Sequence, residues 1–156
     1  MSIKEICQTD AVSISKDSTL KQAAQKMSDF HVGSLIVTNV YNNKEFPSGI
    51  ITDRDIALCM SSSEKPQDIK VELIMQSYPV TIKYTDGIYV AAKIMLENAV
   101  KRLPVVNDDG SLYGIVSADD ILSLVGEETY NLTRLTGSQI LKERGVRMPT
   151  KEYLQI

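Results

Sequence analysis

The sequence has few of the side chains on which most enzymes depend. His31 is the only histidine, and Cys7 and Cys59 are the only cysteines, among 156 residues. The cysteines lie far apart without metal-ligand spacing, so we expect both to be small buried apolar residues in a reducing compartment. His31 falls at the end of an expected helix, where a partly buried structural role is expected. With no serine elbow, P-loop or metal-ligand cluster, the sequence predicts a protein without catalytic activity.

Clusters of basic residues and long apolar segments are also missing. The net charge is −3 and the pI is near 5.2, and no group of Lys and Arg residues forms the basic face of a nucleic-acid-binding protein. No apolar stretch approaches membrane-spanning length, and the first residues lack the pattern of a signal peptide. Hydrophobic residues make up 43% and charged residues 24%, as in ordinary folded proteins. We therefore expect a cytoplasmic protein that binds neither nucleic acid nor membranes.

An internal repeat accounts for most of the chain. Val12-Ser13-Ile14 matches Val80-Thr81-Ile82, 68 positions later, and the same offset pairs Gln8 with Gln76. After the next loop the offset becomes 65, so the first copy carries three extra residues in a polar loop expected over 41–48. We expect repeats over 3–60 and 71–126, a linker over 61–70 and a helical tail over 127–156.

Apolar periodicity predicts the order β-α-β-β-α in the first copy. Strands are expected over 11–15, 34–38 and 49–52, and the second helix over 53–60. Asp17 or Ser18 would cap the first helix, and Gly33 would end it. Its buried face would consist of Leu20, Ala23, Ala24, Met27 and His31.

The second copy predicts the same order, and hence an α+β fold. Strands are expected over 79–83, 102–106 and 112–116, with a tight turn over 107–110. Asp86 would cap a helix that buries Ile88, Ala91, Ala92, Met95 and Ala99. After Gly126 the repeat ends. The segment 127–143 is expected to be a helix interrupted at Thr136-Gly137, and 146–150 to be extended or loose.

One local motif occurs at matching places in both copies, over 49–56 and 114–121. A glycine and two apolar residues precede a hydroxyl residue, Thr52 or Ser117, and an aspartate follows three positions later, Asp55 or Asp120. The pattern predicts a strand that turns sharply into a helix. One interpretation is a capping box. The other is a nucleotide site, in which the helix N-terminus binds phosphate and the carboxylate accepts hydrogen bonds from a ribose diol.

Two basic residues, Lys101 and Arg102, directly precede the strand expected beside the one that ends at Ser117. An arginine there can bind a phosphate through two hydrogen bonds while the helix N-terminus holds it from the other side. The alternative is a pair of solvated surface charges. The first copy has Gly33-Ser34 at the matching places, although Arg54 could supply a charge. We therefore expect two unequal sites, with the stronger phosphate binding in the second copy.

These motifs together resemble a tandem pair of CBS domains, the regulatory repeat named after cystathionine β-synthase. The resemblance covers residues 3 to about 126 and rests on both copies of the motif, on Arg102-Leu103-Pro104-Val105-Val106 and on the segment 71–77. It implies two β-α-β-β-α repeats packed sheet to sheet with pseudo-twofold symmetry, which leaves two clefts between them. Such pairs bind AMP, ADP or ATP, sometimes S-adenosylmethionine or a dinucleotide, and commonly form disc-like homodimers.

The resemblance also implies which residues bind the ligand. The ribose-binding aspartate of the family corresponds to Asp55 and Asp120, and its phosphate contact to Arg102. The base would lie against residues entering the first strand of the opposite repeat, near Val12 for the second-copy site and Val80 for the first. The expected ligand-binding residues are Thr52, Asp55, Ser117, Asp120, Arg102, Lys101, Val12, Val80, Arg54, Pro104, Ile115 and Ile50.

The leading hypothesis is a homodimeric sensor of adenine nucleotides without catalytic activity, covalent cofactor or metal. Nucleotide binding would change the packing of repeats or protomers, and a protein partner that the sequence does not identify would respond. A second hypothesis is a ligand-free dimeric scaffold in which the motifs are only capping boxes. A third is an enzyme that acts on an adenylated substrate, for which the sequence supplies no base, nucleophile or metal set.

Overall fold

The computed structural model describes residues 1–61 and 65–143, with side chains described up to residue 140. The chain divides into two compact units, Met1–Ile121 and Leu122–Ile156. The first unit contains both sheets, and the second begins within the last helix. Residues 62–64 of the predicted linker and the predicted extended segment 146–150 lie outside the described residues.

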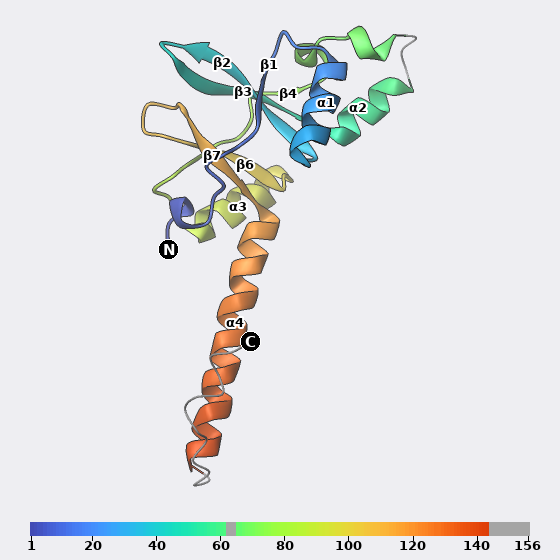
Figure 1. Cartoon of the computed structure of the whole chain (residues 1–156). Helices are drawn as coiled ribbons and strands as arrows, with labels where there is room; N and C mark the ends of the chain where they lie inside the picture. Colours follow the sequence, from blue (N-terminus) through green and yellow to red (C-terminus); the bar gives the residue numbers. More distant parts are fainter. Residues whose placement is uncertain (62–64, 144–156) are drawn as a thin grey trace. The chain divides into compact units, whose positions relative to one another are not determined.

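The first repeat, together with the short strand that leads into the second, forms a four-stranded sheet with two helices (Figure 1). Its strands lie in the order β1 (Ser13–Ser15), β2 (Ser34–Tyr41), β3 (Lys44–Thr52) and β4 (Gln76–Ser77). β1 runs parallel to β2, and the other neighbours are antiparallel. The helices α1 (Leu20–Phe30) and α2 (Asp53–Met60) follow β1 and β3 and contact each other. The described segments that lead into the two repeats also contain short 3-10 helices, η1 (Ile3–Glu5) before the first and η2 (Pro66–Asp68) and η3 (Val71–Leu73) before the second.

The second repeat has the same order of elements. β5 (Ile82–Lys83) pairs in parallel with β6 (Arg102–Val106), which pairs antiparallel with β7 (Leu112–Ser117). α3 (Ile88–Asn98) connects β5 to β6, and α4 (Ala118–Glu143) follows β7. The predicted α+β class with two β-α-β-β-α repeats is therefore confirmed.

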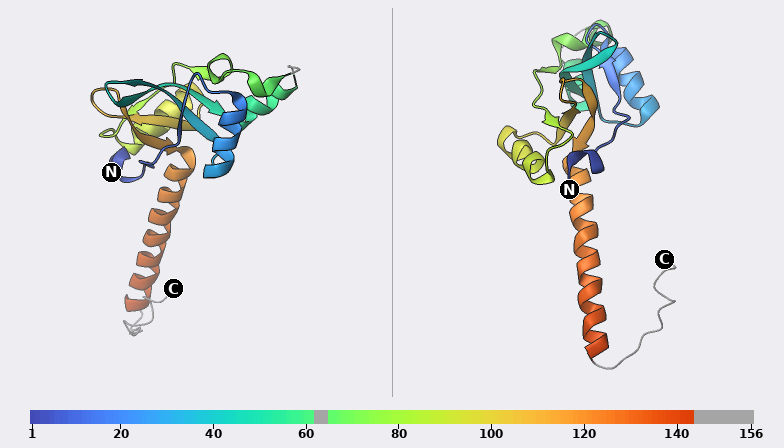
Figure 2. Two further views of the ribbon diagram at one scale, coloured as in Figure 1. Left: turned by 45° about the horizontal axis from the view of Figure 1, so that its top comes forward. Right: turned by 90° about the vertical axis from the view of Figure 1, so that its left-hand side faces the viewer.

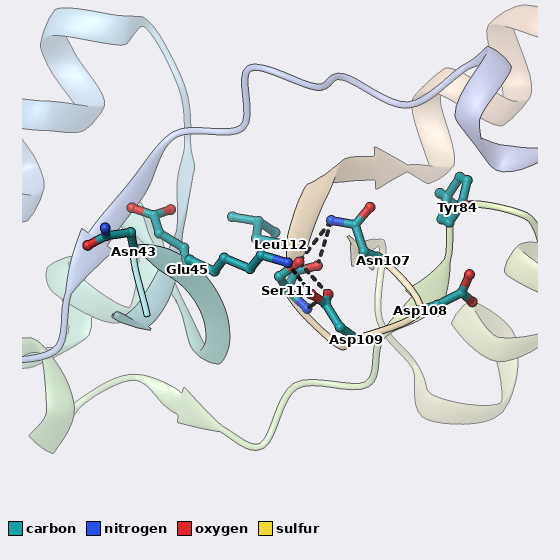
Figure 3. A pocket seen from close by; sticks show the side chains of 9 residues that line it. Asn43, Glu45, Tyr84, Asn107, Asp108, Asp109, Ser111 and Leu112 are labelled. Atoms are coloured by element: carbon teal, nitrogen blue, oxygen red, sulfur yellow. Dashed lines mark hydrogen bonds and ion pairs between the residues drawn. The ribbon is translucent and has the colours of Figure 1, made fainter. Parts of the chain in front are cut away.

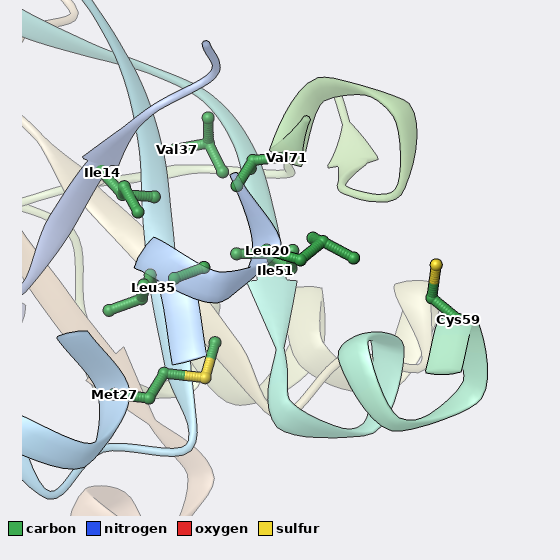
Figure 4. Close-up of a cluster of buried hydrophobic side chains, with 9 residues drawn as sticks. Ile14, Leu20, Met27, Leu35, Val37, Ile51, Cys59 and Val71 are labelled. Carbon is green, nitrogen blue, oxygen red and sulfur yellow. The ribbon is translucent and has the colours of Figure 1, made fainter. Parts of the chain in front are cut away.

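Each sheet has one face on a hydrophobic core and the other toward the second sheet. Side chains alternate between the faces of a strand. Leu35 and Val37 of β2 belong to the first core (Figure 4), whereas Ile36 between them is equally buried but belongs to neither core. Pro104 of β6 holds the same position between Leu103 and Val105 of the second core. Because β3 and β7 also contact each other, the sheets pack face to face as predicted (Figure 2).

The segment that leads into each repeat pairs with the sheet of the other repeat. Gln8 exchanges two backbone hydrogen bonds with Ile115 of β7, both 2.9 Å long, and Ile3 is buried in the second core. In the same way Gln76 of β4 pairs with Ile50 of β3. Val71, just before β4, is buried in the first core. These exchanges tie the two repeats together through the backbone.

The N-terminal caps of α1 and α3 differ from the predictions. Thr19 caps α1 instead of Asp17 or Ser18, through a capping box in which its hydroxyl accepts a hydrogen bond from a backbone N–H one turn later. Gly87 precedes α3 as its N-cap, without a side-chain hydrogen bond. Asp86, predicted to cap α3, accepts a backbone N–H from the end of β5 instead.

The buried faces of α1 and α3 are also narrower than predicted. α1 ends at Phe30 rather than Gly33, and His31 follows it as an exposed left-handed cap with φ of 52°. The prediction that His31 is partly buried is therefore wrong. Ala24, Ala92 and Ala99 are exposed as well. The buried residues are Leu20, Ala23 and Met27 in α1 and Ala91 and Met95 in α3.

The segment 41–48, predicted as a loop, is mostly a β-hairpin. β2 extends to Tyr41 and β3 begins at Lys44, and the turn between them has φ of 49° at Asn42 and 59° at Asn43. Asparagine tolerates this left-handed conformation better than most residues, and two such residues suit a tight hairpin. The three extra residues of the first copy therefore lengthen a hairpin. In contrast, the strands predicted over 11–15 and 79–83 are only Ser13–Ser15 and Ile82–Lys83.

α4 is a continuous helix, so the predicted interruption at Thr136-Gly137 is wrong. The hydroxyls of Thr129, Thr133 and Thr136 each donate to the carbonyl four residues earlier, which satisfies them within the helix. The helix exposes large apolar side chains over its described length: Leu122, Val125, Tyr130, Leu132, Leu135 and Ile140.

The two glycines within α4 offer a test of this continuous helix. A Cβ added at Gly126 or Gly137 would meet nothing within 4 Å. Because glycine destabilises a helix interior, Gly126→Ala and Gly137→Ala should each stabilise the helix by about 0.5–1 kcal/mol. Circular dichroism melting of the full chain should show the gain. Gly87→Ala, at an equally open N-cap position, should give none, because alanine caps worse than glycine.

Candidate functional site

The hydroxyl and carboxylate of the first motif form the predicted capping box at the start of α2. The hydroxyl of Thr52 accepts a 3.2 Å hydrogen bond from the backbone N–H of Asp55. In return, Oδ2 of Asp55 accepts from the backbone N–H of Thr52 at 2.9 Å and from its hydroxyl at 2.7 Å. Both side chains are half-buried. The sequence carries this geometry locally, because a threonine and an aspartate at this spacing satisfy each other's backbone groups.

The second motif forms the same arrangement at the start of α4. Oδ2 of Asp120 accepts from the backbone N–H of Ser117 at 2.7 Å and from its hydroxyl at 2.6 Å, and the Ser117 hydroxyl accepts from the Asp120 N–H at 3.2 Å. The other carboxylate oxygen, Oδ1, accepts a long 3.4 Å hydrogen bond from the Gln8 side chain. The capping-box geometry is therefore confirmed at both junctions, and the nucleotide interpretation stays a prediction. The second carboxylate oxygen of Asp120 is the one that the long contact with the Gln8 side chain reaches.

The two predicted cations lie beside the second junction. Arg102 is paired directly with Ser117 across β6 and β7, and the backbone carbonyl of Lys101 accepts a 2.8 Å hydrogen bond from the Ala118 N–H. Arg102 is half-buried and Lys101 is exposed. At the first junction Ser34 is paired with Thr52, so no cation stands at the matching position of that strand. The two junctions therefore differ in charge as expected, and the stronger phosphate binding of the second stays a prediction.

Cys7 and Gln8 lie near Asp120, although sequence reasoning gave neither a place in the site. Burial raises the pKa of the Cys7 thiol, and the negative charge of Asp120 raises it further. The side chain of Gln8 reaches Asp120 directly. The available signal was the match of Gln8 with Gln76 in the repeat, which marks a position used twice for the same strand pairing.

The remaining predicted ligand-binding residues are spread over the inner faces of the sheets and the chains that enter them. Ile115 is paired with buried Pro104, and Ile50 with Gln76. Val12 follows Gln8 by four positions, and its carbonyl accepts a 3.1 Å hydrogen bond from Ile36. Val80 follows Gln76 by four positions and is 38% exposed. Arg54 lies exposed in the first turn of α2.

A cavity that the sequence did not predict lies between the turns of the two hairpins (Figure 3). It has a volume of about 700 Å³ and is lined by Asn43, Lys44, Glu45, Tyr84, Asn107, Asp108, Asp109, Ser111 and Leu112. Lys44 of the first repeat forms an ion pair of 2.5 Å with Asp109 of the second. The Lys44 ammonium holds the pKa of the Asp109 carboxyl well below its usual range, and the hydroxyl and N–H of Ser111 lower it further.

This ion pair predicts a dependence of stability on pH. Because the folded pKa of Asp109 is depressed below its ordinary value of 3.8, the contribution is present above that pH and is lost as the pH falls toward the folded pKa. Asp109→Asn should therefore flatten the loss of stability in acid, as measured by thermal melts from about pH 6 to about pH 3. Lys44→Met should give a smaller change in the same direction, because Ser111 still lowers the pKa of Asp109, and the double variant should match Asp109→Asn. An unchanged acid slope in both single variants would contradict this assignment.

A smaller groove of about 350 Å³ lies between α1 and α2, lined by Leu20, Lys21, Ala24, Gln25, Ser28, Ile56, Met60 and Gln67. In the described part of the chain, no group of three or more His, Cys, Asp or Glu side chains is placed to hold a metal ion. No helix among the described residues has both the length and the apolar content needed to cross a membrane.

Comparison with known proteins places the repeats in a family. A family model described as "CBS domain" matches residues 3–62 and 69–127. An uncharacterized protein of Methanopyrus kandleri is 32% identical over 125 residues, which cover 80% of this chain and 62% of the relative. The chain therefore spans less than two thirds of that relative's length.

Two solved structures of this kind are similar to the fold. A CBS domain protein from Pyrobaculum aerophilum, solved in complex with AMP, has a TM-score of 0.70 and 27% identity, and the match covers 77% of this chain and 89% of that one. The CBS domain pair of protein MJ0100, solved with 5-methylthioadenosine and S-adenosyl-L-methionine, has a TM-score of 0.71, with coverage of 82% and 98%. Its identity of 23% supports the fold alone.

Proposed function

Because this chain belongs to the CBS-domain family, we propose that it is a cytoplasmic, non-catalytic regulatory module that binds an adenosine-containing ligand in clefts between its repeats. The observation that carries the proposal is the doubled capping box, in which three hydrogen bonds fix each aspartate at a strand–helix junction. A single box is ordinary helix capping. Two boxes at matching junctions, one of them beside Arg102, favour a shared binding function. AMP is the first ligand to test, because a similar protein was solved with it.

The second junction supplies the groups that such a ligand needs. Oδ1 of Asp120 would exchange its long contact with Gln8 for a ribose hydroxyl, because a carboxylate oxygen accepts from either donor. The start of α4 and the guanidinium of Arg102 would bind the phosphate from two sides. The base would lie toward the chain that enters the opposite repeat, near Val12, and near Val80 in the other cleft.

Ligand binding would regulate by changing how the two repeats, or two copies of the chain, pack together. A ligand shifts such an equilibrium only by binding one arrangement more tightly than the other. The clefts lie between the repeats in this proposal, so a bound adenosine would contact both and could favour one arrangement. A protein partner would then respond to that arrangement.

Native mass spectrometry of the full chain with AMP, ADP and ATP, and separately with S-adenosylmethionine and NAD, tests the proposal. We expect at least one adenosine compound to bind with a defined stoichiometry, and the masses also report the oligomeric state. If only S-adenosylmethionine or NAD binds, the proposed site stands and its ligand is that compound instead of an adenine nucleotide. If none of the compounds binds at about 1 mM, well above usual regulatory affinities, the sensor function is wrong.

The second candidate is a ligand-free dimeric scaffold, and the apolar side chains exposed along α4 favour it. An isolated helix of this composition is marginal in water, so a second copy of the chain is a suitable partner. We expect a dimer by sedimentation velocity, shifted toward monomer by Leu132→Glu but not by Thr133→Glu, whose position carries no large apolar group. A wild-type monomer at micromolar concentration would contradict the dimer in both candidate functions.

A further inference from the structure

The two strand–helix junctions have the same backbone connection but different side chains around it. The N–H of Asp53, the first residue of α2, donates to the Gly33 carbonyl at 3.1 Å. The N–H of Ala118, the first residue of α4, donates to the Lys101 carbonyl at 2.8 Å. Gly33 and Lys101 are thus equivalent, and so are Asp53 and Ala118. Where the second junction has Lys101, the first has Gly33. Where the second has Ala118, the first has Asp53.

The carboxylate of Asp53 lies over the glycine. A Cβ added at Gly33 would stand 3.3 Å from Oδ2 of Asp53. In the second junction a lysine side chain leaves the backbone at this point. The first junction therefore presents a negative charge in the region from which the second presents a positive one.

Asp53 also uses an N–H group that a phosphate would need. Its Oδ1 accepts a 2.7 Å hydrogen bond from the N–H of Arg54, the second residue of α2. At the second junction Ala118 precedes Asp119, and an alanine side chain has no oxygen with which to accept from that N–H. The start of α2 thus carries an anion of its own, whereas the equivalent position at the start of α4 does not.

From these differences, we propose that Asp53 is a specificity-determining residue that excludes phosphate from the first site. The site around Thr52 and Asp55 then takes an adenosine ligand without a phosphate, such as adenosine or a cationic or neutral thioadenosine. The site around Ser117 and Asp120, with Arg102 and Lys101, takes the phosphorylated ligand. This inference rests on the proposed function and divides its two clefts between two chemical classes of ligand.

The other charges nearby act in a less direct way. Arg54 in α2 and Asp119 in α4 occupy equivalent positions with opposite signs, and both are exposed. Asp53 is exposed as well, so solvent screens all three side chains. Asp53 differs because its carboxylate is fixed at the junction by the hydrogen bond from the Arg54 N–H. Arg54 is the group that would have to bind phosphate if Asp53 did not exclude it, so the experiment includes it.

Isothermal titration of the full chain with AMP and with adenosine tests the division. In the wild type we expect adenosine to fill two sites per chain and AMP to fill one. Asp53→Asn keeps an oxygen that can accept from the Arg54 N–H and removes only the charge. Asp53→Asn should strengthen AMP binding at the first site by roughly tenfold, the effect of removing one exposed like charge about 4 Å from the phosphate. AMP should then fill two sites per chain. Adenosine binding should change by less than about twofold, because adenosine carries no charge for Asp53 to repel.

Asp119→Asn is the matched control, since it makes the same change of charge in the first turn of the other helix. It should leave AMP at one site per chain. Equal filling of both sites by AMP in the wild type, with one site lost in Arg54→Ala, would overturn the inference and leave the proposed function standing. Failure of Asp53→Asn to bind a second AMP would overturn the inference in the same way. If neither adenosine nor AMP binds the wild type, the proposed function itself fails.

Discussion

Replacing Asp120 by alanine is expected to remove most of the rise in melting temperature that AMP gives the wild-type protein. At an AMP concentration of about 100 times Kd, binding adds about 2.7 kcal/mol of stability, or roughly 5–10 °C in a protein of this size. Asp120 is the proposed ribose acceptor, and its Oδ2 also fixes Ser117 at the start of α4. The variant therefore loses a ligand contact, and it also loses the two hydrogen bonds that hold Ser117 in place. Scanning calorimetry with and without AMP measures the difference.

The controls separate the ligand effect from the loss of a helix cap. Asp120→Ala alone should destabilise the ligand-free protein by about 1 kcal/mol, because a capping box is lost. Gln22→Ala removes the partner of the Thr19 cap on α1, outside the proposed ligand set, and should cost a similar amount while keeping the full AMP response. Asp55→Ala makes the equivalent change in α2 and should also keep it, because phosphate is bound at the other site. An undiminished AMP response in Asp120→Ala would contradict the assignment of the ribose acceptor.

The parts of the site that sequence reasoning predicted are those formed within one motif or across one short hairpin. The capping boxes at Thr52 and Ser117 depend on a hydroxyl and a carboxylate three positions apart, so their geometry follows from the local sequence. The pairing of Arg102 with Ser117 depends on two adjacent strands joined by a short turn, which the repeat and the turn signal at 107–110 predict. In both cases the partners are close in sequence, and few alternatives compete.

The caps of α1 and α3 could not be predicted in this way, because distant segments decide them. The carbonyl of Ser18 accepts a 2.8 Å hydrogen bond from Val71, and the Leu20 N–H donates to Ile69 at 2.8 Å, so the start of α1 is fixed by the segment before β4. The carbonyl of Asp86 accepts from Ile3 at 2.8 Å. Contacts with partners more than forty positions away select the cap among several suitable residues.

The same reasoning explains why Cys7 and Gln8 were missed as neighbours of Asp120. They precede the first predicted strand, and nothing in their local sequence indicates a strand pairing with β7. The repeat offset does contain the information, because it aligns Gln8 with Gln76 and the motif glycine Gly114 with Gly49. What the sequence alone does not provide is that each of these glycines stands beside the incoming segment.

Gly114→Ala is expected to be the most destabilising of the single substitutions considered for this protein. A Cβ at Gly114 would lie 2.4 Å from the carbonyl oxygen of Gln8 and 3.3 Å from the Cα of Thr9, both backbone atoms. The incoming segment would have to move away, which breaks the two 2.9 Å hydrogen bonds between Gln8 and Ile115. With about 1 kcal/mol for each hydrogen bond and a further overpacking term, we expect a loss of about 3 kcal/mol. Chemical denaturation followed by circular dichroism measures it.

Gly49→Ala is the matched substitution in the first repeat, and it should cost less. There the added Cβ would lie 2.5 Å from the sulfur of Met75 and 3.1 Å from the carbonyl oxygen of Gln76. The methionine side chain is flexible and can turn aside, so most of the clash disappears and the strand pairing needs only a small shift. Because the segment displaced by Gly114→Ala carries the Gln8 side chain that contacts Asp120, that variant should also weaken AMP binding, whereas Gly49→Ala should not. Equal stability of the two variants would mean that the chain entering β7 adjusts as easily as a methionine side chain. Unchanged AMP binding in Gly114→Ala would mean that Gln8 does not hold the second site in place.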